Sequence, residues 1–147
     1  MRKNVLSAAL AFGLLALVTT ATAYAQVPGT ALHATIPFDF RVRGKILPAG
    51  DYEISRITEQ PDGLIISSLN DKHKRVVFET EAVEARRISS RSEIVFQRYG
   101  NTYFLSEIFS GTEQTGRELP PSRQELRLKR EMASNKTEPE TVALAAY

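Results

Sequence analysis

Residues 36–54, which read IPFDFRVRGKILPAGDYEI, decide the fold. Phe38, Phe40 and Val42 alternate with charged residues, and this period of two is typical of a β-strand with one buried face. Residues 47–50 (Leu-Pro-Ala-Gly) are turn-forming, because proline fixes φ and glycine admits a positive φ. The alternation resumes after this turn. The stretch therefore predicts two strands of a sheet.

A five-residue loop over residues 46–50 would place these two strands in a chemically matched register. The facing pairs would be Lys45 with Asp51, Arg43 with Glu53, and Val42 with Ile54. Such cross-strand pairs contribute ~0.2–1 kcal/mol each. A slip by one residue would exchange the two faces. We therefore predict an antiparallel hairpin in this register.

Further strands are predicted between the turn signals that follow. The apolar, alternating stretches are residues 64–69, 75–81, 93–99 and 102–109. Gly100-Asn101 suits a type II′ turn, so the last two stretches should form a hairpin. Residues 82–92 could continue a strand, form a helical turn or loop over the surface, and we predict an irregular conformation. About six strands with turns every 8–12 residues predict a mainly β domain over 35–119, an antiparallel sandwich or small barrel.

The chain is expected to end in a helix and a flexible tail. Pro120-Pro121 ends the sheet, and Ser122 with Glu125 forms a capping-box pattern. We predict a helix over 120–134 and a tail over 135–147. The helix has a narrow apolar stripe and should dock weakly. The last predicted hairpin has two apolar faces. Ile94, Phe96 and Leu105 form the first face, and Val95, Phe104 and Ile108 form the second. We predict that the helix covers the second face.

The N-terminus has the pattern of a cleavable signal peptide over 1–25. Arg2 and Lys3 precede an uncharged apolar stretch, and Ala23 and Ala25 provide the small residues of a signal-peptidase site. The strongly apolar stretch is shorter than the ~20 residues of a transmembrane helix, so we expect cleavage rather than an anchor. Residues 26–34 would then form a lead-in. The protein is expected to be exported, to the periplasm or the outside of the cell.

Charge and composition narrow the function classes. The chain has 19 Lys and Arg, 17 Asp and Glu, and no Cys. Cleavage would remove two basic residues and leave a neutral chain, which gives nucleic-acid binding or stable membrane insertion no support. Without Cys there is no thiolate catalysis, thiolate metal site or disulfide. We predict no cofactor.

Several groups of polar residues are candidates for a catalytic, metal or anion-binding site. His33 and His73 have no evident carboxylate partner and are expected to be surface residues. Glu79 and Glu81 should share the solvent face of one strand. Glu107 would lie beside Ile94, where an apolar neighbour raises the pKa of a carboxyl. A candidate anion site comprises Arg86, Arg87 and Arg91. Basic and acidic residues alternate along the predicted helix, as on a solvated surface. Its basic residues are Arg123, Arg127, Lys129 and Arg130.

One segment resembles a known group of proteins. Ile36-Pro37-Phe38-Asp39-Phe40, the Leu47–Gly50 turn and Tyr52-Glu53-Ile54 are similar to the opening of small uncharacterised exported proteins of acidobacterial type. The function of that family is unassigned, so the resemblance implies a fold opening and no site.

The sequence therefore favours an exported, non-enzymatic binding or envelope-associated domain, with an unknown protein or small ligand as partner. One alternative is a carrier of an apolar ligand, with a cavity lined by Phe38, Phe40, Tyr52, Phe96 and Phe104. The other is a hydrolase with two carboxyl groups within ~5–9.5 Å of each other.

Overall fold

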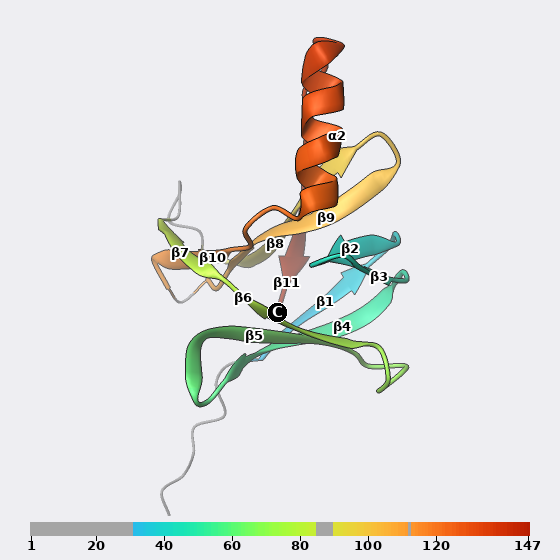
Figure 1. Ribbon diagram of the computed structural model, residues 1–147. Coiled ribbons are helices and arrows are strands. Elements are labelled where there is room, and N and C mark those ends of the chain that lie inside the picture. The colour runs from blue at the N-terminus through green and yellow to red at the C-terminus, as the bar shows by residue number, and fades with distance from the viewer. Residues whose placement is uncertain (1–30, 85–89, 112) are drawn as a thin grey trace, which may run out of the picture.

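The computed structural model describes residues 31–84, 90–111 and 113–147, which form two β-sheets and a helix (Figure 1). Sheet 1 is antiparallel, with strand order β1 (Leu32–Ile36), β4 (Gly50–Ile57), β5 (Gln60–Ser68) and β6 (Arg75–Glu79). Sheet 2 has the order β11 (Glu140–Ala146), β8 (Ser92–Tyr99), β9 (Thr102–Phe109), β10 (Thr115–Glu118) and β7 (Glu81–Glu84). The mainly β prediction is confirmed, and the described strands do not close into a barrel.

Sheet 2 is mixed because of the short hairpin of β2 (Phe40–Val42) and β3 (Lys45–Leu47). β2 pairs antiparallel with β3 and parallel with β9. Phe40 and Val42 are buried, as their alternation predicted. The predicted hairpin register is wrong, however, because the turn lies at Arg43-Gly44, where φ is 49° and 85°. Two consecutive positive φ values are the signature of a tight type I′ turn.

The strand after the Leu-Pro-Ala-Gly segment therefore has a different partner from the one predicted. β4 pairs with β1, so that Ile54 faces Leu32 and Glu53 faces His33. Part of the predicted lead-in over 26–34 is thus strand β1. The connection from β3 to β4 is held by the Ala49 N–H, which donates to Asp39 at 2.9 Å, and by the Tyr52 hydroxyl, which donates to the Pro48 carbonyl at 2.6 Å.

The two sheets face each other across one core and are joined at both ends of their strand order. At one junction His33 and Tyr147 exchange backbone hydrogen bonds of 2.8 and 3.0 Å, which connects β1 to β11. At the other, the chain passes from β6 to β7 through Thr80, which is 5% exposed. The N–H and the hydroxyl of Thr80 both donate to the Asp62 carbonyl at 2.9 Å. The predicted single strand over 75–81 is therefore split between the sheets.

The Gly100-Asn101 hairpin is confirmed, with Tyr99 facing Thr102. Gly100 has φ +61° whereas Asn101 keeps a negative φ, which fits a type II′ turn. A β-bulge between Val95 and Phe96 then shifts the register by one residue. Glu107 consequently faces Val95, while Ile108 takes the place beside Ile94. The prediction that Glu107 lies beside Ile94 is wrong for this reason.

The helix α2 (Arg123–Ser134) is confirmed, together with its cap. Ser122 Oγ accepts from the Glu125 N–H at 3.2 Å. The helix rises away from the sheets, and only its first part lies against them (Figure 1). The predicted tail is wrong, because residues 140–146 form β11, which pairs with β8 along its whole length. Val142, Leu144 and Ala146 pack against the core from this strand.

Candidate functional site

Aromatic side chains fill the interior between the sheets. Phe40 is 1% exposed and makes edge contacts with Tyr52 and Phe96, at ring-centroid distances of 5.1 and 5.5 Å. Phe38 stacks on Tyr103 at 3.8 Å and also meets the edge of Phe96 at 5.2 Å. The fifth residue of the carrier hypothesis, Phe104, instead packs against Tyr99, at 5.6 Å. Phe38, Phe40, Tyr52 and Phe96 therefore form one cluster of contacting rings where the carrier hypothesis needs empty space.

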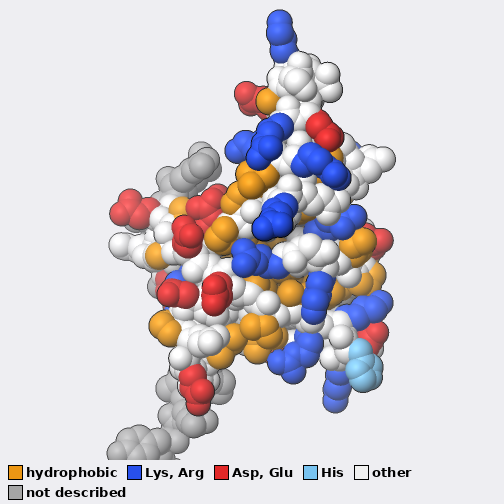
Figure 2. Space-filling model, in the orientation of Figure 1, with side chains coloured by type: hydrophobic (Ala, Val, Ile, Leu, Met, Phe, Trp, Pro, Cys, Tyr) orange, Lys and Arg blue, Asp and Glu red, His pale blue; other side chains and the backbone are white. Residues whose placement is uncertain are grey.

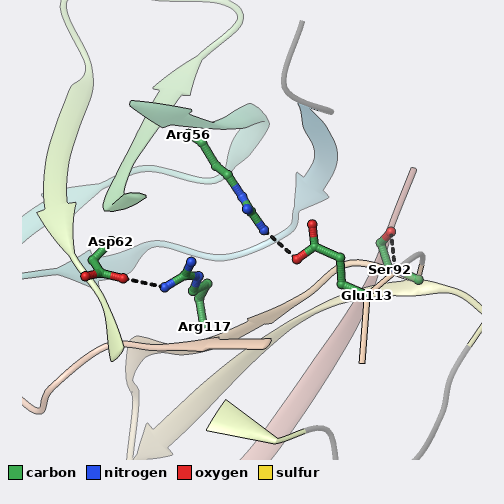
Figure 3. Close-up of polar contacts among 6 residues, drawn as sticks. Arg56, Asp62, Ser92, Glu113 and Arg117 are labelled. Carbon is green, nitrogen blue, oxygen red and sulfur yellow. Dashed lines mark hydrogen bonds and ion pairs between the residues drawn. The ribbon is translucent and has the colours of Figure 1, made fainter. Parts of the chain in front are cut away.

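Two ion pairs close one end of the sandwich (Figure 3). Arg56 of β4 pairs with Glu113, which lies between β9 and β10, and Arg117 of β10 pairs with Asp62 of β5 at 2.7 Å. The crevice beneath them holds about 40 Å³, and Leu32, Ile54, Leu64 and Ile108 supply its apolar wall. That volume accommodates a few water molecules and no larger ligand. The ion pairs therefore bridge the two sheets over an almost filled core.

A ligand-sized hollow, an open cleft of about 470 Å³, lies beside the β6–β7 junction. Such a volume lies within the ~300–1,000 Å³ of small-molecule sites. Glu59, Glu79 and Glu81 line this cleft and are exposed. Within the described residues these glutamates form no ion pair, whereas the Asp62 that also lines the cleft is neutralised by Arg117. Arg43 is the basic residue of the lining, so the cleft carries an excess of negative charge.

A second acidic feature adjoins the cleft on sheet 2. Glu81 of β7 lies directly opposite Glu118 of β10, and Glu118 lies opposite Glu107 of β9. Like charges in directly opposite positions destabilise a sheet by ~0.2–1 kcal/mol per pair. Neither Glu81 nor Glu118 has an ion-pair partner among the residues that the structure describes. We call Glu59, Glu79, Glu81 and Glu118 the acidic rim.

The predicted pair Glu79 and Glu81 is brought to this cleft, although not on one strand face as expected. Glu79 ends β6 in sheet 1 and Glu81 begins β7 in sheet 2, with buried Thr80 between them. Sequence reasoning missed Glu59 and Glu118, because Glu59 reaches the rim from the β4–β5 turn and Glu118 from strand β10. The sequence predicts a turn at Gln60-Pro61-Asp62-Gly63, but in the structure these residues belong to β5 and the turn lies just before them, at Thr58-Glu59.

Both histidines lie away from the cleft. His33 is half-buried, with Nε2 at 3.9 Å from a Glu53 oxygen and its ring stacked on Tyr147 at 6.0 Å. His73 is exposed, and its backbone N–H donates to Asp71 at 3.0 Å. His33 thus has a carboxylate partner that its sequence neighbours did not reveal, because Glu53 lies on the adjacent strand β4.

The other predicted site residues are only partly described. Arg86 and Arg87 of the anion site lie outside the described residues, as do Ala23 and Ala25 of the signal-peptidase site. Arg91 is exposed and precedes β8. Within the described ranges, no group of three or more His, Cys, Asp or Glu side chains is arranged to hold a metal ion. No described helix is long and apolar enough to cross a membrane.

A buried carboxyl group lies where α2 meets the sheet. Glu125 is 8% exposed and accepts a hydrogen bond from the Tyr99 hydroxyl at 3.4 Å. Burial raises the pKa of Glu125, against the opposing effects of the Ser122 backbone N–H, the Tyr99 hydroxyl and Lys129. Burial and the neighbouring Glu125 carboxylate raise the pKa of Tyr99 to about 12. Because these groups satisfy one another beneath the helix, the pair anchors α2 and is not a reactive site.

Comparison with known proteins identifies no family for this chain. No family model matches the sequence. The searches of curated proteins and of solved structures also found no significant match.

Proposed function

We propose that this protein is an exported, non-enzymatic β domain that binds a positively charged partner at the cleft beside the β6–β7 junction. The observation that carries the proposal is the acidic rim, in which exposed Glu59, Glu79 and Glu81 line a ligand-sized hollow and Glu118 lies opposite Glu81 on the neighbouring strand. The export part of the proposal is supported by the basic, apolar and small-residue order of residues 1–25.

Binding is favoured over catalysis by the chemistry of the rim. A hydrolase of the kind considered above needs one carboxyl kept protonated near neutral pH as an acid and another kept ionised. Among the described residues, burial raises the pKa of the Glu125 carboxyl group, but Glu125 does not line the cleft. The rim glutamates are exposed to water, as suits ionised carboxylates that attract a cation.

Placing Glu81 opposite Glu118 has a cost in the free protein that a bound cation would remove. An amine or guanidinium group between these carboxylates would convert a repulsive pair into two attractive contacts. Salt would screen the attraction between this group and the carboxylates, because the rim is exposed to water. Affinity at the cleft should therefore fall as ionic strength rises.

The test is isothermal titration of residues 26–147 with spermidine and with a tri-lysine peptide, two probes that separate a small polyamine from a peptide partner. We expect binding at low salt and a tenfold or greater loss in the double variant Glu59→Gln/Glu81→Gln. Glu131→Gln removes an exposed glutamate of α2 and is the matched control, expected to bind as the wild type does. Absence of binding by both probes, or an equal loss in the control, would overturn the proposal.

A further inference from the structure

Strand β6 is an edge strand with an unusual distribution of charge. Among the described strands it pairs with β5 and with no other. Val76 and Phe78 point into the core, and Arg75, Val77 and Glu79 alternate with them on the outer face. Val77 is 54% exposed at the centre of this edge. An open edge with an exposed apolar residue is a template for pairing with another strand.

The hydrogen bonds to β5 show which backbone groups of β6 remain available. The Ser68 N–H donates to the Lys74 carbonyl, and the Thr80 N–H donates to the Asp62 carbonyl, each at 2.9 Å. In an antiparallel ladder the bonded positions alternate, so residues 74, 76, 78 and 80 face β5. The N–H and C=O groups of Arg75, Val77 and Glu79 therefore point toward the open side.

The order of charges along this edge makes β6 complementary to itself. Arg75 and Glu79 are equally distant from Val77, and the basic residues Lys72 and Lys74 precede the strand whereas Glu81 follows it. Figure 2 shows the same polarity on the lower part of the molecule, with Lys and Arg toward the right and Asp and Glu toward the left. We infer that β6 pairs with β6 of a second copy of this chain, antiparallel, about a two-fold axis at Val77.

In this register every outward-pointing backbone N–H and C=O group of β6 would form a hydrogen bond with the second copy. Val77 would face Val77 of the second copy, and Arg75 would face its Glu79 on both sides of the axis. All three outward-facing residues would then exchange backbone hydrogen bonds, as in the regular ladder. A slip by two residues would place Val77 against an arginine or a glutamate and leave the end charges unmatched. A two-fold, self-complementary contact is also the commonest way in which soluble proteins form dimers.

Charged residues on a sheet edge often prevent pairing, and this is the competing explanation. Prevention requires that the charges repel an incoming strand or disfavour its desolvation. Here the two ends of β6 have opposite signs, so an antiparallel second copy is attracted at both ends. The order of signs, rather than the number of charges, therefore identifies the second copy as the occupant.

The test uses charge exchange in residues 26–147, followed by sedimentation equilibrium. We expect the wild type to dimerise, Arg75→Glu and Glu79→Arg each to weaken the dimer tenfold or more, and the double variant Arg75→Glu/Glu79→Arg to recover it. An equimolar mixture of the two single variants should form a heterodimer, because opposite charges then face each other again. Lys45→Glu on exposed β3 is the control and should leave the dimer unchanged. A wild type that stays monomeric at about 100 µM, which would mean a Kd well above that concentration, or a double variant as weak as the singles, would overturn the inference.

Cysteine cross-linking tests the position of the axis separately. Residues facing each other in a bonded antiparallel pair have Cα atoms ~5.5 Å apart, within the range that a disulfide spans. Because the chain contains no Cys, Val77→Cys should give a single covalent dimer under mild oxidation. Ile46→Cys, at a similarly exposed position on β3, should remain largely monomeric. Equal cross-linking of the two variants would contradict pairing at Val77. The cross-linking test changes no residue of the acidic rim, so its failure is distinguishable from failure of the cleft proposal.

Discussion

Truncation of Phe40 to alanine tests whether the interior is filled as the structure shows. The Phe40 side chain is 1% exposed, and its ring meets the edges of Tyr52 and Phe96. Removing a fully buried phenylalanine costs about 3–5 kcal/mol through lost transfer free energy and the cavity left behind. Two aromatic pairs, each worth ~0.5–1.5 kcal/mol, place this site toward the upper part of that range.

The measurement is urea unfolding of residues 26–147, followed by far-ultraviolet circular dichroism. With a denaturant slope of ~2 kcal/mol per molar urea for a domain of this size, the loss should lower the midpoint by about 2 M. Ile46→Ala is the control, because Ile46 is 60% exposed on the edge strand β3. We expect its effect to stay within about 0.5 kcal/mol.

A small loss of stability in Phe40→Ala would refute the reasoning. If the free energy of unfolding fell by less than about 1 kcal/mol, the ring could not be packed on all sides, and the interior would have the spare room that a carrier needs. The wild type itself should gain no stability from an added apolar ligand, because its aromatic interior leaves no room for one.

Three further predictions concern the helix anchor, the β2–β3 turn and β11. Ionisation of Glu125 opposes folding because burial raises its folded-state pKa above the unfolded value; stability from this group is present at low pH and falls as the pH rises toward the folded pKa. Glu125→Gln should thus gain stability relative to the wild type at pH 7 but not at pH 4, in thermal melts compared with Glu131→Gln. Arg43→Asn should raise the free energy of unfolding by about 0.5 kcal/mol, because asparagine tolerates the positive φ at that turn position better; an unchanged melting temperature would contradict this. Deletion of residues 140–147 should cost about 3 kcal/mol or more in urea unfolding, since it uncovers apolar core beside β8, whereas deletion of a true tail would cost almost nothing.

The features that the sequence predicted correctly are local ones. The alternation around Phe40, the Gly100-Asn101 turn and the Ser122–Glu125 cap each depend on residues a few positions apart. Their energetics are determined by backbone geometry and one or two nearby side chains. Such signals survive in any tertiary context, and the structure therefore reproduces them.

The errors concern partners that are distant along the chain. β4 pairs with β1 and not with β2, because Arg43-Gly44 makes a tighter turn than the Leu47–Gly50 segment after it. The sequence does not mark β11 as a strand, because Glu138, Pro139 and Glu140 precede its core-facing residues, which are only half-buried. The bulge beside Val95 moved Glu107 by one position, and nothing in the local sequence marks it.

The cleft illustrates the same limit for function. Glu79 and Glu81 were recognised as a pair from their spacing, but the rim exists because Thr80 carries the chain from one sheet to the other. Glu118 joins them through the pairing of β7 with β10. Since that pairing joins residues far apart in the sequence, no spacing rule could have predicted that Glu118 adjoins the three glutamates that line the hollow.

The two proposals meet at Glu79, and this makes them separable. In the β6 dimer, Arg75 of the second copy would lie against Glu79 and neutralise part of the acidic rim. Because linkage is reciprocal, a cation bound near Glu79 would then weaken dimerisation by the same factor by which dimerisation weakens cation binding. A change at Glu79 therefore perturbs both equilibria, whereas a change at Glu59 reports on the cleft alone and a change at Arg75 acts first on the dimer. Changes at Glu79, Glu59 and Arg75 should therefore affect cation binding and dimerisation in three different combinations. If β6 took part in only one of these two interactions, the three combinations would not all differ.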